Sequence, residues 1–111
     1  MKKINAIVRP VRLYALRSAL RRLPNFPGMT VTDCSGMSAP DRLGENRDPL
    51  ADFSSKVRIE IVADDPQTLP IIDTIRACAA TGQVGDGIVW VSPVDEMWRI
   101  GPAGMGPDGG N

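Results

Sequence analysis

Three closely spaced glycines, Gly82, Gly85 and Gly87, precede an apolar run in the stretch TGQVGDGIVWV at residues 81–91. Successive backbone N–H groups in such a turn can form a concave nest that binds anions. The spacing is G-x-x-G-x-G between a predicted helix and a predicted strand, whereas the dinucleotide fingerprint is G-x-G-x-x-G between a strand and a helix. No Gly-Lys-Ser/Thr ending follows, so neither common nucleotide loop is present. Taken alone, the glycines favour a plain turn.

The residues of common catalytic and metal sites are scarce. The sequence contains no histidine, which removes the most frequent general base and neutral metal ligand. Asp33, Asp64 and Asp65 fit a strand and a helix cap, and no nucleophile–base pair is evident. Cys34 and Cys78 lie far apart without C-x-x-C spacing, so two reduced thiols are expected and a disulfide stays open. We therefore expect neither an enzyme nor a metal site.

Composition indicates one soluble domain of 111 residues. Thirteen basic and thirteen acidic residues balance, so no overall field recruits nucleic acid or anionic lipid. Residues 1–25 hold seven basic and no acidic residue, which we interpret as a solvated helix face rather than a binding patch. No stretch approaches the roughly 20 apolar residues of a membrane span, and no signal peptide is evident. A cytoplasmic location without membrane insertion is expected.

Hydrophobic periodicity predicts the elements that must position the glycines. Alternating apolar residues, clearest in KVRIEIVA at 56–63, indicate strands, and apolar residues spaced by three and four indicate helices. Asp64-Asp65-Pro66 predicts the start of the second helix, and Gly82 its end. The expected elements are a strand at 3–8, a helix at 11–23, a strand at 29–35, a long loop at 36–55, a strand at 56–63, a helix from 64 to 82, a strand at 88–91, an additional strand at 94–100 and an unpacked tail at 101–111.

This order predicts an α+β protein of the ferredoxin-like kind. Two β-α-β halves form a βαββαβ arrangement, with an antiparallel four-stranded sheet and two helices on one face. Alternation places Ile7 and Val62 on the opposite, open face. Because something must cover apolar residues there, we expect a homo-oligomer.

Residues 1–100 resemble the PII signal-transduction protein family. The resemblance lies in MKKINAIVRPVRL at 1–13, PGMTVTDCSG at 27–36, KVRIEIV at 56–62 and TGQVGDGIVWVSPV at 81–94, in the family's order. It implies a homotrimer of ferredoxin-like subunits with adenine-nucleotide sites in the clefts between subunits. A long T-loop, here about 37–55, would dock on a partner protein, and the phosphate loop would occupy about 82–88. Such proteins are sensors rather than catalysts.

The resemblance also implies a set of nucleotide-binding residues. The residues carried over are Gly28, Met29 and Thr30 at the adenine and ribose, Gly36, Met37 and Ser38 at the opening of the T-loop, Val84, Gly85, Asp86, Gly87 and Ile88 in the phosphate loop, and Arg99, which would reach the phosphates from a neighbouring subunit.

Several positions depart from the family's pattern. Ile88 stands where the loop G-D-G-K has its lysine, and Gly101 stands where the last strand has a second arginine. Ala39 and Pro40 replace an arginine and a glutamine that serve the terminal phosphate, magnesium and 2-oxoglutarate. Each lost charge-assisted contact would contribute about 1.5–3 kcal/mol, so ADP and AMP are expected to bind better than ATP. The only tyrosine, Tyr14, lies outside the T-loop, so uridylylation is not expected.

Within the family, the resemblance is closest to PII-like proteins associated with carboxysomes and bicarbonate transport, which bind ADP or AMP. Lys56 and Arg58 are the candidates for bicarbonate, with solvated charge on a strand edge as an equal alternative. The tail MGPDGGN at 105–111 resembles a redox tail with both cysteines replaced. The T-loop partner would be a carbon-transport or carboxysome-related protein. Two alternatives stay open: a nitrogen-regulating PII protein that binds ATP and 2-oxoglutarate, and a trimeric scaffold without a ligand.

Overall fold

The computed structural model of the chain describes residues 1–37 and 53–101. Ser38, Ala39, Pro40 and most of the predicted T-loop therefore lie outside the described residues, as does the tail from 102 onward. The elements, in chain order, are β1 (Lys2–Val8), the 3₁₀ turn η1 (Pro10–Arg12), α1 (Leu13–Arg21), β2 (Thr30–Met37), β3 (Phe53–Ala63), α2 (Asp65–Ala79) and β4 (Gly87–Pro93).

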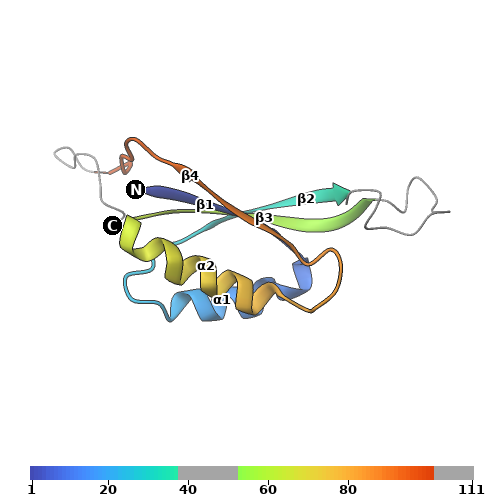
Figure 1. Cartoon of the computed structure of the whole chain (residues 1–111). Coiled ribbons are helices and arrows are strands. Elements are labelled where there is room, and N and C mark those ends of the chain that lie inside the picture. Colours follow the sequence, from blue (N-terminus) through green and yellow to red (C-terminus); the bar gives the residue numbers. More distant parts are fainter. Residues whose placement is uncertain (38–52, 102–111) are drawn as a thin grey trace.

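The four strands form one sheet in the order β2-β3-β1-β4, and every neighbouring pair is antiparallel. Both helices pack on the same face of this sheet (Figure 1). β1 lies in the middle, where Val8 pairs with Val57 of β3 and with Gly87 of β4. The predicted ferredoxin-like arrangement is therefore confirmed.

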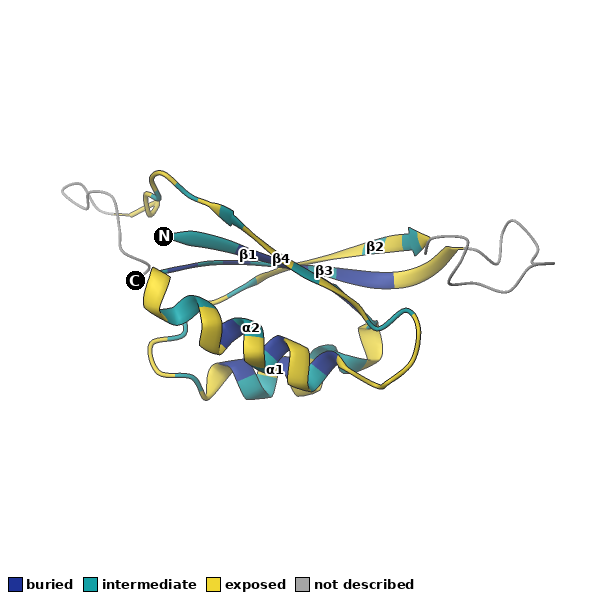
Figure 2. Ribbon diagram, viewed as in Figure 1, coloured by how far each residue is buried: buried dark blue, intermediate teal, exposed yellow. Residues whose placement is uncertain are grey.

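The core lies between the sheet and the helices, as alternation predicted (Figure 2). Every second residue from Ile4 to Val8 in β1 and from Val57 to Ala63 in β3 points toward α1 and α2 and is buried, whereas the neighbouring residues point to the other face. Burial of such aliphatic side chains is the main source of stability in a domain of this size. The buried apolar residues are Ile4, Ala6, Val8, Leu16, Leu20, Val57, Ile59, Ile61, Ala63, Ile71, Ile75 and Ala79.

The start of α2 was predicted correctly, but its end was predicted too late in the sequence. Asp64 and Gln67 form a reciprocal capping box, in which each side chain satisfies a backbone N–H that the first helical turn leaves unpaired. The helix ends at Ala79, because Ala80 is already extended at φ −72° and ψ 133°. Gly82 has φ +82° but lies beyond this point and does not terminate the helix.

Three further boundaries differ from the sequence prediction. The first helix begins with the 3₁₀ turn at Pro10, and its α-helical part ends at Arg21 instead of residue 23. Met37 pairs with Phe53, so β2 and β3 extend into both ends of the predicted T-loop. The additional strand at 94–100 is wrong for the described chain: β4 ends at Pro93, and only an isolated bridge at Trp98 follows.

The face of the sheet opposite the helices carries a polar network around β1. Glu60 is paired with Lys3 Nζ at 3.1 Å and with Arg58 Nε at 3.2 Å. The guanidinium carbon of Arg58 lies 5.7 Å from the ring centre of Trp90, within the range of a cation–π interaction. Asn5 is only 2% exposed and donates its side-chain N–H to the Lys3 carbonyl oxygen at 3.2 Å. No element among the described residues covers this face.

Candidate functional site

The glycine-rich loop connects the end of α2 to the start of β4, and its last glycine is required by the sheet itself. Gly87 begins β4 opposite Val8 with φ +125°. A Cβ atom at this position would lie 1.9 Å from the carbonyl oxygen of Ile7. Because β1 backbone occupies that space, no residue with a side chain fits without moving a strand. The close approach that Gly87 makes is therefore to this chain's own β1.

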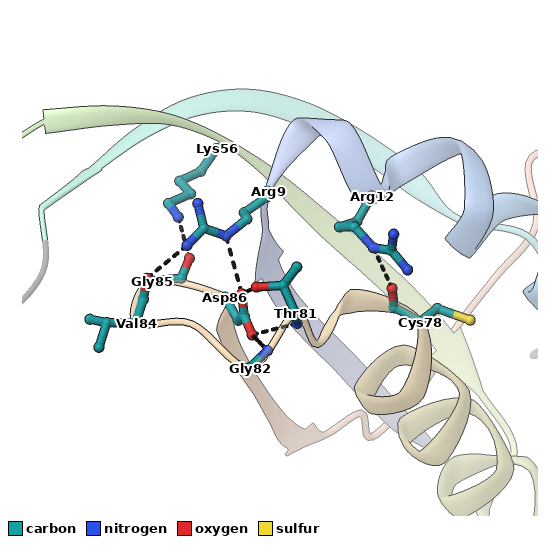
Figure 3. Close-up of polar contacts among 9 residues, drawn as sticks. All are labelled: Arg9, Arg12, Lys56, Cys78, Thr81, Gly82, Val84, Gly85 and Asp86. Atoms are coloured by element: carbon teal, nitrogen blue, oxygen red, sulfur yellow. Dashed lines mark hydrogen bonds and ion pairs between the residues drawn. The ribbon is translucent and has the colours of Figure 1, made fainter.

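Asp86 anchors the loop from within (Figure 3). Its Oδ2 accepts hydrogen bonds from the backbone N–H of Thr81 at 2.6 Å and of Gly82 at 3.0 Å. Its Oδ1 accepts from the Thr81 hydroxyl and from Arg9 Nε. The Thr81 side chain and backbone, with smaller help from Arg9 and Gly82, hold the pKa of the Asp86 carboxyl well below its ordinary value. Asp86 is thus ionised and fully engaged within the protein.

Arg9 reaches the loop from the end of β1, and it was missed by the sequence analysis. Its Nε donates to Asp86 Oδ1 at 3.1 Å and its Nη2 donates to the Val84 carbonyl oxygen at 2.7 Å. A Cβ atom on Gly85 would lie 3.2 Å from Nη2, so the absence of a side chain lets the guanidinium lie against the backbone. The only sequence indication was a basic residue just after a strand and before Pro10.

Lys56 approaches the loop from β3. Only 9% of the residue is exposed, and its ammonium donates to the Gly85 carbonyl oxygen at 2.5 Å. Burial, followed by the nearby charge of Arg9, lowers the pKa of Lys56, while Asp86 opposes this shift. Lys56 and Arg9 supply two positive charges against one on Asp86, which leaves the site with an excess of one positive charge.

A hollow of about 490 Å³ lies beside this loop. It brings together most of the residues that sequence resemblance assigned to the phosphates and the T-loop opening, and it adds Lys56, Ile7 and Gln83. Ile88, which is 64% exposed, adds an apolar side chain to this lining. A lysine at the same position would add a positive charge instead. The lining residues are Ile7, Gly36, Met37, Lys56, Gln83, Val84, Gly85, Asp86, Gly87 and Ile88.

The remaining nucleotide-binding candidates lie elsewhere in the same chain. Gly28 and Met29 line a separate hollow of about 560 Å³ that also contains Arg17 and Arg21. Thr30 begins β2 and Gly36 is near its end, so six residue steps, or about 20 Å of strand, separate them. Within one chain, Gly28 and Met29 therefore do not share a pocket with the glycine-rich loop.

Arg99 also lies away from the glycine-rich loop along the chain. It follows β4 by six residues, at the end where Pro93 pairs with Lys2. Gly87 is at the opposite end of that strand, about 20 Å away for six residue steps. The described structure thus divides the predicted nucleotide residues into two groups at opposite ends of the sheet.

The two bicarbonate candidates, Lys56 and Arg58, have different surroundings. Lys56 lines the hollow beside the glycine-rich loop. Arg58 lies two residues further along β3 and is paired with Glu60 and stacked on Trp90 instead. Lys56 thus belongs to the lining of the hollow, whereas Arg58 belongs to the polar network of the open face.

The described part of the chain shows neither a metal-binding cluster nor a membrane-spanning helix. No group of three His, Cys, Asp or Glu residues within 1–37 and 53–101 is placed to hold a metal ion. None of the described helices has the length and apolar character needed to cross a membrane.

Comparison with known proteins identifies the family. The family described as Nitrogen regulatory protein P-II matches residues 1–103. Proteins named Nitrogen regulatory protein P-II are similar over nearly the whole chain: that of Azospirillum brasilense is 36% identical, covering 97% of this chain and 98% of its own length. That of Bradyrhizobium diazoefficiens is 38% identical with the same coverage, and that of Nostoc punctiforme is 37% identical, covering 90% of this chain and 91% of its own length. The chain belongs to the P-II family of regulatory signalling proteins.

Proposed function

We propose that this P-II protein is a homotrimeric sensor that binds adenine nucleotides in clefts between its subunits, with ADP and AMP preferred over ATP. It would signal through its T-loop in inorganic-carbon metabolism and would catalyse no reaction of its own. One observation carries the nucleotide proposal: the hollow beside the glycine-rich loop combines the buried cation Lys56 with the apolar side chain of Ile88.

The size and charge of the hollow suit a nucleotide with few phosphates. Its volume of about 490 Å³ lies within the usual range of about 300–1,000 Å³ for small-molecule sites. The excess positive charge of Arg9 and Lys56 over Asp86 favours an anion. Ile88, however, adds no cation where a third phosphate would need one, and a charge-assisted contact to phosphate contributes about 1.5–3 kcal/mol.

The division of the candidate residues supports a site between subunits. Gly28, Met29 and Arg99 are remote from the hollow of their own chain. A second copy associated through the open face of the sheet could bring its own Gly28 and Met29 against that hollow and complete the site. The open face of the sheet, with Trp90 and Asn5 near its centre, offers the surface through which three copies would associate.

Bicarbonate would be held by Lys56 and not by Arg58. The Lys56 ammonium now has the Gly85 carbonyl oxygen as its acceptor, and an anion could replace that oxygen as a stronger partner. Lys56→Ala should therefore abolish any effect of bicarbonate while nucleotide binding stays measurable. Arg58→Ala is the matched control on the same strand, and it should leave the bicarbonate effect intact.

A second candidate function is the nitrogen regulation that gives the similar proteins their name. A protein of that kind would bind ATP together with 2-oxoglutarate. The two candidate functions predict different orders of nucleotide affinity. Titration calorimetry with AMP, ADP and ATP, with and without magnesium and 2-oxoglutarate, therefore distinguishes them. The proposal requires AMP or ADP to bind more tightly than ATP, and an ATP affinity that rises with 2-oxoglutarate would favour the nitrogen regulator instead.

A further inference from the structure

Arg9 joins two separate points of the glycine-rich loop to the sheet through its charged side chain. It donates to the Asp86 carboxylate and to the Val84 carbonyl oxygen, 77 and 75 residues away in sequence. We infer that Arg9 is a positioning residue of the phosphate loop, and that it sets the loop conformation that binds an anionic ligand without touching that ligand. The inference rests on the proposed nucleotide-binding function.

The contacts of Arg9 distinguish it from a direct ligand. The residues that line the hollow include Lys56 but not Arg9. Its Nε and Nη2 are both engaged by the loop, and Nη2 lies 3.2 Å from where a Cβ atom on Gly85 would be. The guanidinium therefore supports the loop backbone from outside the hollow, whereas Lys56 is the cation inside it.

The loop needs such support because of its glycines. Gly82, Gly85 and Gly87 all have positive φ, between +82° and +125°. Glycine has the largest conformational freedom to lose on ordering, so a loop with three of them needs additional contacts to hold one shape. Asp86 and Arg9 supply these contacts at the middle of the loop.

Holding a carbonyl also orients the next N–H. The described peptide bonds contain no cis bond, and in a planar trans peptide the C=O and N–H point in opposite directions. With the Val84 carbonyl held by Arg9 and the Gly85 carbonyl held by Lys56, both peptide planes are fixed, and the directions of the Gly85 and Asp86 N–H groups are fixed with them. Fixed donors of this kind are what an anion-binding nest requires, and they matter more here because Ile88 adds no charge.

The test compares Arg9→Gln, which removes the charge and the paired donors, with Arg9→Lys, which keeps the charge but supplies one donor group. Arg22→Gln is the control, since Arg22 is an exposed residue at the end of α1. Calorimetry would measure the affinities for AMP, ADP and ATP, and amide hydrogen exchange would report on residues 82–87 in the ligand-free protein.

We expect Arg9→Gln to weaken the binding of all three nucleotides by a similar factor of about ten, which is the equivalent of about one hydrogen bond between the misplaced loop and the charged ligand. Loop amides should exchange faster, and Arg9→Lys should restore only part of both effects. A loss that grows steadily from AMP to ATP would overturn the inference, because it would mean direct contact with the phosphates. Unchanged loop exchange in Arg9→Gln would also overturn it. If the unsubstituted protein binds no nucleotide, the proposed function fails, while hydrogen exchange still decides whether Arg9 holds the loop.

Discussion

Arg9 Nε lies 3.1 Å from Asp86 Oδ1, although 77 residues of sequence separate the two residues. This pair connects the end of β1 to the loop that precedes β4, which are neighbouring strands in the sheet. The same carboxylate also accepts hydrogen bonds from Thr81 and Gly82. A single aspartate therefore joins the end of α2, the glycine-rich loop and the central strand.

The first prediction concerns the pH dependence of stability that Asp86 provides. Its folded-state pKa is lowered by hydrogen bonds from Thr81, Arg9 and Gly82, whereas an unfolded aspartate titrates near about 3.9. A lowered pKa stabilises the fold fully above the unfolded value, and this stabilisation is lost as the pH falls toward the folded value. Asp86→Asn should therefore reduce the free energy of unfolding clearly at pH 7 and by a smaller amount at pH 2.5.

Urea denaturation of both proteins at the two pH values measures this difference. Asp73→Asn, an exposed carboxyl on α2, is a matched control for loss of one negative charge. Equal destabilisation by Asp86→Asn at both pH values would show that its hydrogen bonds to the loop do not depend on ionisation.

The second prediction concerns Gly87. A Cβ atom there would overlap the Ile7 carbonyl oxygen at 1.9 Å, and φ is +125°. Gly87→Ala should destabilise the protein by about 3 kcal/mol or more, because overpacking and backbone strain add. Gly82→Ala is the control: its φ is +82°, but nothing lies within 4 Å of the added atom. Gly82→Ala should lower the free energy of unfolding by about 1–2 kcal/mol from backbone strain alone. Thermal denaturation of both variants measures the difference. Equal destabilisation by the two substitutions would contradict the overlap at Gly87.

The third prediction concerns nucleotide preference. Ile88→Lys adds a cation to the lining of the hollow, where Ile88 is exposed. One charge-assisted phosphate contact should raise ATP affinity about tenfold or more, while AMP affinity should change less. Ile88→Met keeps an apolar side chain of similar volume and should leave the order of AMP, ADP and ATP unchanged in calorimetry. An equal gain for all three nucleotides would argue against a site near the terminal phosphates.

The fourth prediction concerns assembly through the open sheet face. Trp90→Asp removes the surface on which Arg58 stacks and adds a negative charge on the face that also carries Glu60. The proposed trimer should dissociate to monomers, as judged by light scattering. Leu69→Asp, at a residue 68% exposed on α2, introduces the same charge on the helical side and should leave the trimer intact. If Leu69→Asp dissociated the trimer and Trp90→Asp did not, the interface between subunits would lie on the helical side instead.

Much of the fold followed from local patterns in the sequence. Alternation placed Ile59 and Ile61 in the core, and the sequence Asp64-Asp65-Pro66 located the start of α2. The additional strand at 94–100 failed because alternation alone does not supply a neighbouring strand with free hydrogen-bonding groups. The helix end was misplaced because a glycine with positive φ serves equally well within the following loop, as Gly82 does.

The site was less predictable because its contacts are long-range. Glycine spacing and family resemblance indicated the loop at 84–88, and the hollow contains these residues together with Gly36 and Met37. Arg9 was missed, since no local pattern shows that a residue after β1 meets a loop 75 residues later. Arg58 was grouped with Lys56 by sequence proximity, whereas its pairing with Glu60 depends on neighbouring strands.

The most direct measurement is a calorimetric titration of the full chain with ADP at fixed pH, with and without bicarbonate. The account predicts that ADP binds at one site per subunit, and that bicarbonate tightens this binding in the unsubstituted protein but not in Lys56→Ala. Absence of ADP binding in both conditions would contradict it, because the glycine-rich loop with Lys56 and Arg9 would then be only a turn of the scaffold.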